Sequence, residues 1–337
     1  LCNGYDPDLE LQCALDLALD ARRPDLVELL LSWGADPHRV DLEKLFGTYD
    51  SALFERFYRL GVDLTRRHAL AEALGYHTSN RPLYGFAKRY HQTDARIQRD
   101  LDMALAHHAW EGNERGAFLC LWAGGDPHAS VPSLRYYDEE DEDEEEAEAG
   151  DGSSAVYGAC YSGQVKLLER FAPDPSRHDF DRFYRVAHSA AVVEVLARSA
   201  LPTDMTEVVQ SLVQSVGWYF GSRDAVAALR RLFELGARWT EASPKDVGEL
   251  RRWLYRLDEW RFKEVVLILG TDDYCSAEIR RELARTEGFQ KRMRAADLLP
   301  ERGDRWWQRR RGAEQARAMM AAYGLDVPAP AKQRPRR

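Results

Sequence analysis

Apolar residues recur at intervals of three and four along most of the chain, which is the spacing of one face of an α-helix. The segment 24–34 reads PDLVELLLSWG, where Leu26, Val27 and three further leucines form a broad apolar stripe that ends at Gly34. A shorter segment with small residues on one side precedes it, separated by a polar turn. The pattern predicts a short helix, a turn, a second helix with a broad apolar face, and a glycine stop.

This unit occurs more than once. Residues 13–38 and 103–128 align without a gap, and both end in the pattern G-x-D-P-H. The offset corresponds to three repeats of about 30 residues. We expect Ala18 and Ala109 to lie where helices of adjacent repeats approach closely. Gly34 and Gly124 should adopt the left-handed conformation that ends a helix, since the Asp-Pro that follows disfavours its continuation.

The segment from Cys13 to Asp36 resembles the ankyrin repeat, whose consensus runs T-P-L-H-x-A-A-x-x-G-H-x-x-V-V-x-L-L-L-x-x-G-A-D. A third copy covers residues 154–171, with Gly163 at the turn, and weaker copies cover residues 42–64, 183–201, 224–239 and 253–270. The Thr-Pro-Leu-His tetrad is replaced in the first two copies, and residues 65–100 match poorly. The resemblance implies an all-α fold, an ankyrin-like α-solenoid of roughly seven or eight stacked helix pairs joined by short loops or hairpins.

The domain organisation follows from the repeats and from the charge pattern. Residues 1–275 are predicted to form the helical repeat domain, interrupted by an acidic insertion at 137–152 that is expected to be a disordered, solvated loop. Residues 276–326 are predicted to form a helical cap, with one amphipathic helix in 276–299 and another in 305–325. Residues 327–337 form a basic tail.

Composition and motifs exclude several classes of function without identifying one. The chain has a formal net charge of -9, no long apolar run and no secretory signal, so we expect a cytoplasmic protein, and its Ala- and Arg-rich composition is typical of bacteria. Five scattered cysteines form no C-x-x-C pair, which argues against a disulfide framework or a zinc site. No phosphate-binding glycine loop or nucleophile elbow occurs. We therefore expect no enzymatic activity, no metal and no cofactor.

We expect the protein to recognise another protein on the concave face of the solenoid. In ankyrin repeats the residues just before the turn glycine commonly contact the partner, and the resemblance carries this role to the following positions of the chain: Asp20, Ala21, Gly47, Thr48, Trp110, Glu111, Tyr161 and Ser162. Trp110 and Tyr161 stand out, since exposed aromatic residues are enriched at binding hot spots. His107 and His108 do not reproduce a metal-binding helix motif, and packing between repeats explains His108 better.

Two other functions stay open. A nucleic-acid-associated regulator would use the basic C-terminal region, where residues 279–337 contain 16 Lys or Arg against 7 Asp or Glu. Trp306, Trp307, Arg309, Arg310 and Arg311 would stack on bases and contact phosphates, although they would equally suit a soluble cap. A neutraliser of a basic toxin or nuclease would instead use the acidic surface, including the eleven carboxylates between Asp138 and Asp151.

Overall fold

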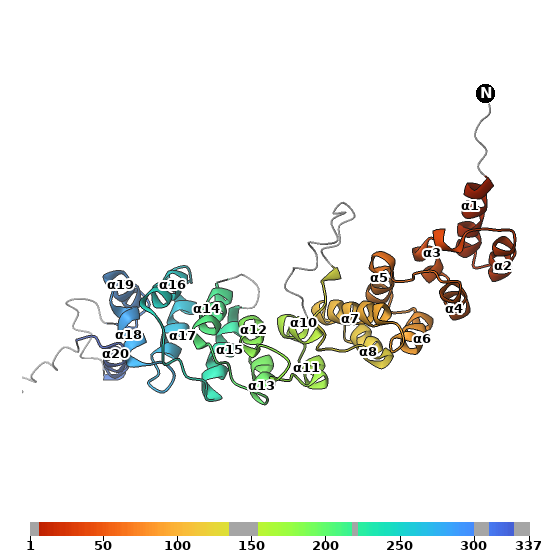
Figure 1. Ribbon diagram of the computed structural model, residues 1–337. Coiled ribbons are helices and arrows are strands. Elements are labelled where there is room, and N and C mark those ends of the chain that lie inside the picture. The colour runs from red at the N-terminus through yellow and green to blue at the C-terminus, as the bar shows by residue number, and fades with distance from the viewer. Residues whose placement is uncertain (1–6, 135–153, 218–221, 300–309, 327–337) are drawn as a thin grey trace, which may run out of the picture. The chain divides into compact units, whose positions relative to one another are not determined.

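The computed structural model describes residues 7–134, 154–217, 222–299 and 310–326 (Figure 1). Over these residues the protein is all-helical, which confirms the all-α part of the predicted fold class, and the described bridge residues Val131, Trp239 and Cys275 belong to no extended β-strand. The chain divides into two compact units, residues 1–171 and 172–337. The predicted acidic insertion and basic tail lie outside the described residues.

Unit 1 consists of consecutive helix pairs. Its helices are α1 (Pro7–Asp20), α2 (Pro24–Ser32), η1 (Pro37–Arg39), α3 (Leu42–Gly47), α4 (Ser51–Arg59), η2 (Arg66–His68), α5 (Ala69–Tyr76), α6 (Arg81–Tyr90), α7 (Ala95–Trp110), α8 (Glu114–Ala123), α10 (Ala155–Tyr161) and α11 (Val165–Phe171). The first helices of successive pairs pack side by side in the order α1, α3, α5, α7 and α10. The second helices α4, α6 and α8 form an adjoining layer (Figure 1).

Residues 65–100, where the sequence repeat is weakest, nevertheless form a complete pair, α5 and α6. The two helices are separated by a turn, and the Asn80 side chain caps α6 by accepting a hydrogen bond from the Leu83 amide at 3.3 Å. The same side chain donates to the Phe46 carbonyl at 2.9 Å. A single buried asparagine thus starts one helix and ties it to the preceding pair.

Four of the described loops that follow a second helix share one local structure. Gly34 and Gly124 have φ values of 101° and 106°, as predicted for left-handed helix stops. Two residues later, the carboxylates of Asp36 and Asp126 accept hydrogen bonds from the amides of His38 and His128 at 2.9 and 3.0 Å. The same combination occurs in two further loops, at Gly61 with Asp63 and at Ala172 with Asp174.

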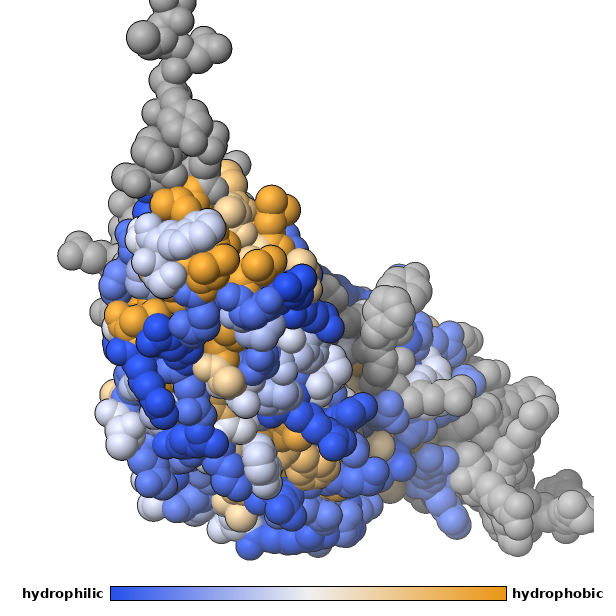
Figure 2. All heavy atoms as spheres, turned by 90° about the vertical axis from the view of Figure 1, so that its right-hand side faces the viewer, coloured by the Kyte–Doolittle hydropathy of each residue, from blue (hydrophilic) through white to orange (hydrophobic). Residues whose placement is uncertain are grey.

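Packing between pairs uses small and aromatic side chains. Ala18 and Ala109 are buried, as expected. The stripe of α2 is only half covered, since Val27 and Leu30 are buried while Leu26 and Leu29 remain 37% and 41% exposed. Burial of such a stripe depends on helices on both sides, and α2 has a following pair on one side only in the described chain. Apolar side chains accordingly gather on this end of unit 1 (Figure 2).

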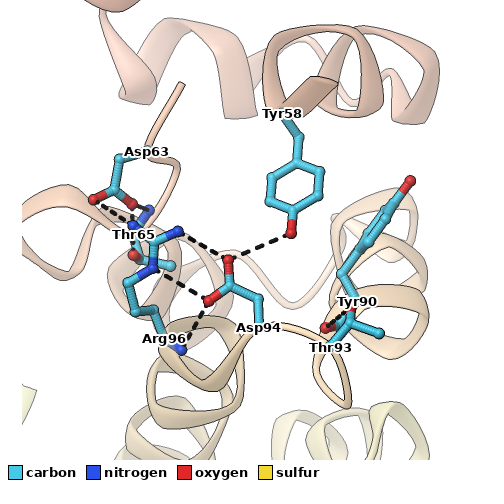
Figure 3. A network of polar contacts seen from close by, with 7 residues as sticks. All are labelled: Tyr58, Asp63, Thr65, Tyr90, Thr93, Asp94 and Arg96. Atoms are coloured by element: carbon cyan, nitrogen blue, oxygen red, sulfur yellow. Dashed lines mark hydrogen bonds and ion pairs between the residues drawn. The ribbon is translucent and has the colours of Figure 1, made fainter. Parts of the chain in front are cut away.

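A polar network ties successive pairs together at the N-terminal end of α7 (Figure 3). Asp94 caps α7 through the Arg96 amide at 3.0 Å and accepts the Tyr58 hydroxyl of α4 at 3.4 Å. The Arg96 guanidinium lies 3.0 Å from Asp94 and 3.1 Å from Asp63, which belongs to the loop that follows α4. The hydrogen bond from Arg96 is the main reason that the pKa of Asp94 lies below its usual value. These contacts hold the start of α7 against α4 and the loop that follows it, which is a structural role.

Unit 2 repeats the layered arrangement. Its helices are α12 (Phe180–Val186), α13 (Ala190–Ala197), α14 (Met205–Val216), α15 (Ser222–Glu234), α16 (Pro244–Leu254), α17 (Glu259–Leu269), α18 (Ala277–Ala284), α19 (Glu287–Ala295) and α20 (Arg310–Ala322). One layer follows the order α12, α14, α16 and α18, and the other follows α13, α15 and α17.

The predicted single helix in 276–299 is wrong, because two helices, α18 and α19, occupy that segment. The Thr286 hydroxyl accepts a hydrogen bond from the Phe289 amide at 3.4 Å and so starts a new helix in the middle of an apolar pattern that reads as continuous. The following α20 is anchored by Tyr323, whose buried hydroxyl donates to the Val266 carbonyl of α17 at 2.8 Å.

The left-handed residues in two turns allow the backbone conformation there to be tested by mutation. Gly163 has φ 73° with open space around the position of a Cβ atom, whereas Ala172 has φ 50° although it carries a side chain. Left-handed backbone costs a non-glycine residue about 1–2 kcal/mol. We expect Gly163→Ala to lower the free energy of unfolding by about 1 kcal/mol and Ala172→Gly to raise it by about 0.5 kcal/mol. Urea unfolding should show the two opposite signs, and equal signs would contradict the assigned turns.

Candidate partner-binding site

The structure brings together the two aromatic residues that the sequence singled out. Trp110 is the last residue of α7, and its ring lies parallel to that of Tyr161, the last residue of α10, with the ring centroids 4.2 Å apart. Tyr157, one turn earlier on α10, also stacks on Trp110 at 5.9 Å. Tyr161 is 47% exposed, while Trp110 is half-buried.

Local sequence explains the close approach of α7 and α10. A Cβ atom on Gly158 would lie 2.9 Å from the Trp110 nitrogen, so the contact requires glycine there. The Ser162 hydroxyl donates a hydrogen bond to the Ala109 carbonyl at 2.7 Å and fixes the end of α10 against the end of α7. The stacked rings are therefore set by the backbone contact beneath them.

A second aromatic contact joins α5 to α7. Tyr76, the last residue of α5, is 59% exposed and lies edge-on to His107 of α7, with centroids 4.8 Å apart. Gly75 permits this contact, since a Cβ atom there would lie 3.3 Å from the His107 ring. We call the set formed by Tyr76, His107, Trp110, Tyr157 and Tyr161 the aromatic row.

The aromatic row contains residues that the sequence analysis missed. Tyr76 and Tyr157 were not predicted, although both signals were present: Tyr76 directly precedes a turn, as Trp110 and Tyr161 do, and Tyr157 lies four residues before Tyr161 and so shares its helix face. The weak repeat match in 65–100 concealed the first signal.

The surface beside the row is shallow. A small pocket of about 20 Å³ is lined by Trp110 and His107 together with Leu134 and Ser154. Such a volume holds about one water molecule, far less than a small-molecule site requires. The aromatic row is suited to a ligand that lies across the surface.

Other predicted contact residues have different surroundings. Thr48 is buried and is therefore not available to a partner: α3 ends after six residues, and the Thr48 hydroxyl turns back to the Leu45 carbonyl at 2.7 Å. Ser162 holds α10 against α7, as described above. Asp20 is exposed but forms an ion pair with Lys44 at 3.0 Å. Glu111 is exposed in the turn that follows Trp110.

The predicted packing role of His108 is confirmed. Its ring is buried between pairs, with Nε2 3.0 Å from the Leu74 carbonyl and Nδ1 3.3 Å from the Asn113 amide nitrogen. The carbonyl can only accept, so Nε2 carries the proton, and burial lowers the pKa of His108 to about 4. In the described part of the chain, no three His, Cys, Asp or Glu residues are placed to hold a metal ion.

The side chains proposed for nucleic-acid contact lie outside the described structure. Trp306, Trp307 and Arg309 lie outside the described residues. Arg310 and Arg311 belong to the first turn of α20, but the described structure does not extend to their side chains.

Comparison with models of known protein families found no match, and comparison with curated proteins found none either. Among the described helices, none is both long enough and apolar enough to span a lipid bilayer.

Proposed function

We propose that the protein is a non-catalytic, ankyrin-like helical-repeat module that binds another protein through the aromatic row. The observation that carries the proposal is the clustering of partly exposed aromatic rings at the ends of three adjacent first helices, α5, α7 and α10. Clustered aromatic side chains on a rigid helical scaffold favour recognition, because they provide contact area at low entropic cost. A cytoplasmic location remains part of the proposal.

Site-specific photo-cross-linking in the native cells tests this function. A photoreactive phenylalanine analogue is placed at position 76, at position 161, or at position 260 as a control, since Trp260 of α17 is 48% exposed and Tyr161 is 47% exposed. We expect positions 76 and 161 to cross-link to the same protein and position 260 not to do so. Equal labelling at all three positions, or none at any, would count against the proposal.

The identified partner then allows a quantitative test. Tyr161→Ala should weaken binding by about 2 kcal/mol, roughly 30-fold, because it removes exposed aromatic area without opening the core. Trp110→Ala is a less specific probe, since Trp110 also packs between α7 and α10. Calorimetry with Trp260→Ala as the control measures the difference, and an unchanged affinity for Tyr161→Ala would exclude this surface.

A further inference from the structure

We propose that a second copy of this chain binds to the open side of the first helix pair, so that the protein forms a dimer through α1 and α2. The contact surface is an apolar face made by Leu17 of α1 and by Leu26, Leu29 and Trp33 of α2, which we call the end face. It shares no residue with the aromatic row, so the inference does not depend on the proposed function.

Exposed apolar side chains are concentrated on the end face. Of the eleven exposed large apolar side chains in the described chain, four fall within residues 17–33. Leu17 and Trp33 are 66% and 64% exposed. Leu26, Leu29 and Trp33 share one side of α2, because they are spaced three and four residues apart. Figure 2 shows the apolar side chains gathered on this end of unit 1, and contiguous patches of this kind mark interaction sites.

The positions of the end face are contact positions in a later helix pair. In the gapless alignment of residues 13–38 with 103–128, Leu17 corresponds to His107 and Trp33 to Ala123. The His107 ring packs against Tyr76 of the preceding pair, with centroids 4.8 Å apart, and Ala123 is fully buried. Both positions are therefore covered where a helix pair precedes them.

The second pair gives the same result for Leu29. When the loops are aligned at Gly34 and Gly61, Leu29 corresponds to Arg56. The Arg56 guanidinium of α4 lies 2.9 Å from Glu28 of α2, so this position also faces the preceding pair. The end face thus has the form of a contact between helix pairs, although no pair precedes it in the described chain.

The charges beside the end face are balanced. Residues 11–33 contain four carboxylates and two arginines, and the next helix pair adds two cations. Three ion pairs result, Asp20 with Lys44 at 3.0 Å, Asp25 with Arg23 at 2.6 Å and Glu28 with Arg56 at 2.9 Å. The other two charged residues are Asp16, which is half-buried, and Arg22, which lies 5.3 Å from the Tyr49 ring centre. A second copy with the same charges can approach this face without net repulsion, and neither a strongly acidic nor a strongly basic partner is favoured.

The C-terminal helices offer no matching surface for a head-to-tail contact. The described side chains of residues 261–299 and 313–326 include no exposed large apolar residue. A contact between the end faces of two copies, related by a twofold axis, covers both apolar surfaces at once and closes the assembly at two chains. This symmetric arrangement is therefore favoured over a filament.

The size of the end face determines the expected affinity. A helix rises about 1.5 Å per residue and packed helices lie about 8–10 Å apart, so the 14-residue α1 and its neighbour α2 present a face of about 20 Å by 20 Å. Two such faces bury about 1,000 Å² together, near the lower limit for a specific interface. We expect a dissociation constant on the order of 10 μM. Trp33 should be the strongest contact, since tryptophan is enriched at binding hot spots.

Sedimentation velocity of the full-length protein tests the inference over about 1–200 μM. We expect the wild type to pass from monomer to dimer, and Trp33→Ala to raise the dissociation constant at least about 30-fold. Leu17→Ala, on the other helix of the face, should raise it at least about tenfold, because the side chain is lost from both copies. Trp260→Ala is the matched control, since Trp260 is 48% exposed on α17, and it should stay within about twofold of the wild type. Circular dichroism verifies that each variant folds.

Photo-cross-linking identifies what the end face contacts. A photoreactive phenylalanine analogue is placed at position 33, and isotope-labelled protein is mixed with unlabelled protein so that mass spectrometry distinguishes the two copies. We expect cross-links from position 33 to residues 11–33 of the other copy. Cross-links to residues 310–326 of the other copy would show a head-to-tail contact, and cross-links to residues 1–6 of the same copy would show that the chain covers its own end face. Either result would overturn the inference.

The inference is also overturned if the protein stays monomeric up to about 200 μM, or if Trp33→Ala and Trp260→Ala behave alike. Tyr161→Ala separates it from the proposed function, because a dimer formed through the end face should persist in that variant. Loss of the dimer in Tyr161→Ala but not in Trp33→Ala would overturn the inference and identify a second copy as the partner of the aromatic row. A monomeric protein whose position 161 still cross-links to another protein would contradict the dimer and leave the proposed function standing.

Discussion

Phe54→Ala should lower the free energy of unfolding by about 3–5 kcal/mol, the range for truncating a buried phenylalanine. Phe54 of α4 is fully buried and contacts Phe46 of α3 and Phe86 of α6 edge-on, with ring centroids 5.9 and 6.4 Å away. Its removal opens a cavity where two consecutive helix pairs meet. Urea unfolding followed by circular dichroism measures the loss.

A matched truncation makes this experiment specific for packing between pairs. Leu29→Ala on α2 removes an apolar side chain that is 41% exposed, so we expect a loss below about 1 kcal/mol. Hydrogen exchange should show faster exchange in both α4 and α6 of the Phe54→Ala variant, because each pair in a stack is stabilised by its neighbours. Faster exchange confined to α4 would show that the pairs do not share a core.

Features encoded within a few residues could be predicted from the sequence. The left-handed stops at Gly34 and Gly124 need only a glycine and a following Asp-Pro, and both occur as expected. The all-α fold class follows equally from helical periodicity. The helix break before Thr286 was missed because a threonine cap interrupts the backbone without interrupting the apolar pattern.

Features that depend on neighbours could not be predicted in the same way. The side chains of Leu26 and Leu29 belong to a well-formed apolar stripe, yet their burial depends on which helices flank α2. Thr48 occupies a position that the repeat pattern marks as exposed, but the short helix α3 ends there and the side chain turns inward.

The candidate site depends both on local sequence and on contacts between neighbouring helices. Trp110 and Tyr161 were identified from their positions before a turn, whereas their stacking depends on the close contact at Gly158, which no local pattern reports. The arrangement of the row, and not only its residue types, is therefore the information that the structure adds.

Acidification should destabilise the protein through His108. Burial lowers the pKa of this residue from its ordinary 6.5 to about 4 in the folded state. Between these two pH values the unfolded chain binds more protons than the folded chain, so the free energy of unfolding should fall as the pH decreases from 6.5 to 4. The expected loss from this residue is about 3 kcal/mol, with no further change below pH 4.

Isolating this contribution requires a variant, because other groups titrate over the same range. Asp102, whose pKa burial raises to about 6, acts in the opposite direction: the folded chain binds the extra proton, so its contribution increases on acidification. His108→Gln keeps a donor for the Leu74 carbonyl and removes the titration. Urea unfolding of both proteins at pH 7, 5 and 4 gives the difference attributable to His108, since Asp102 is common to both. We expect the wild type to lose about 3 kcal/mol more than the variant over this range. Parallel pH profiles would show that the His108 ring is not held neutral between the helix pairs.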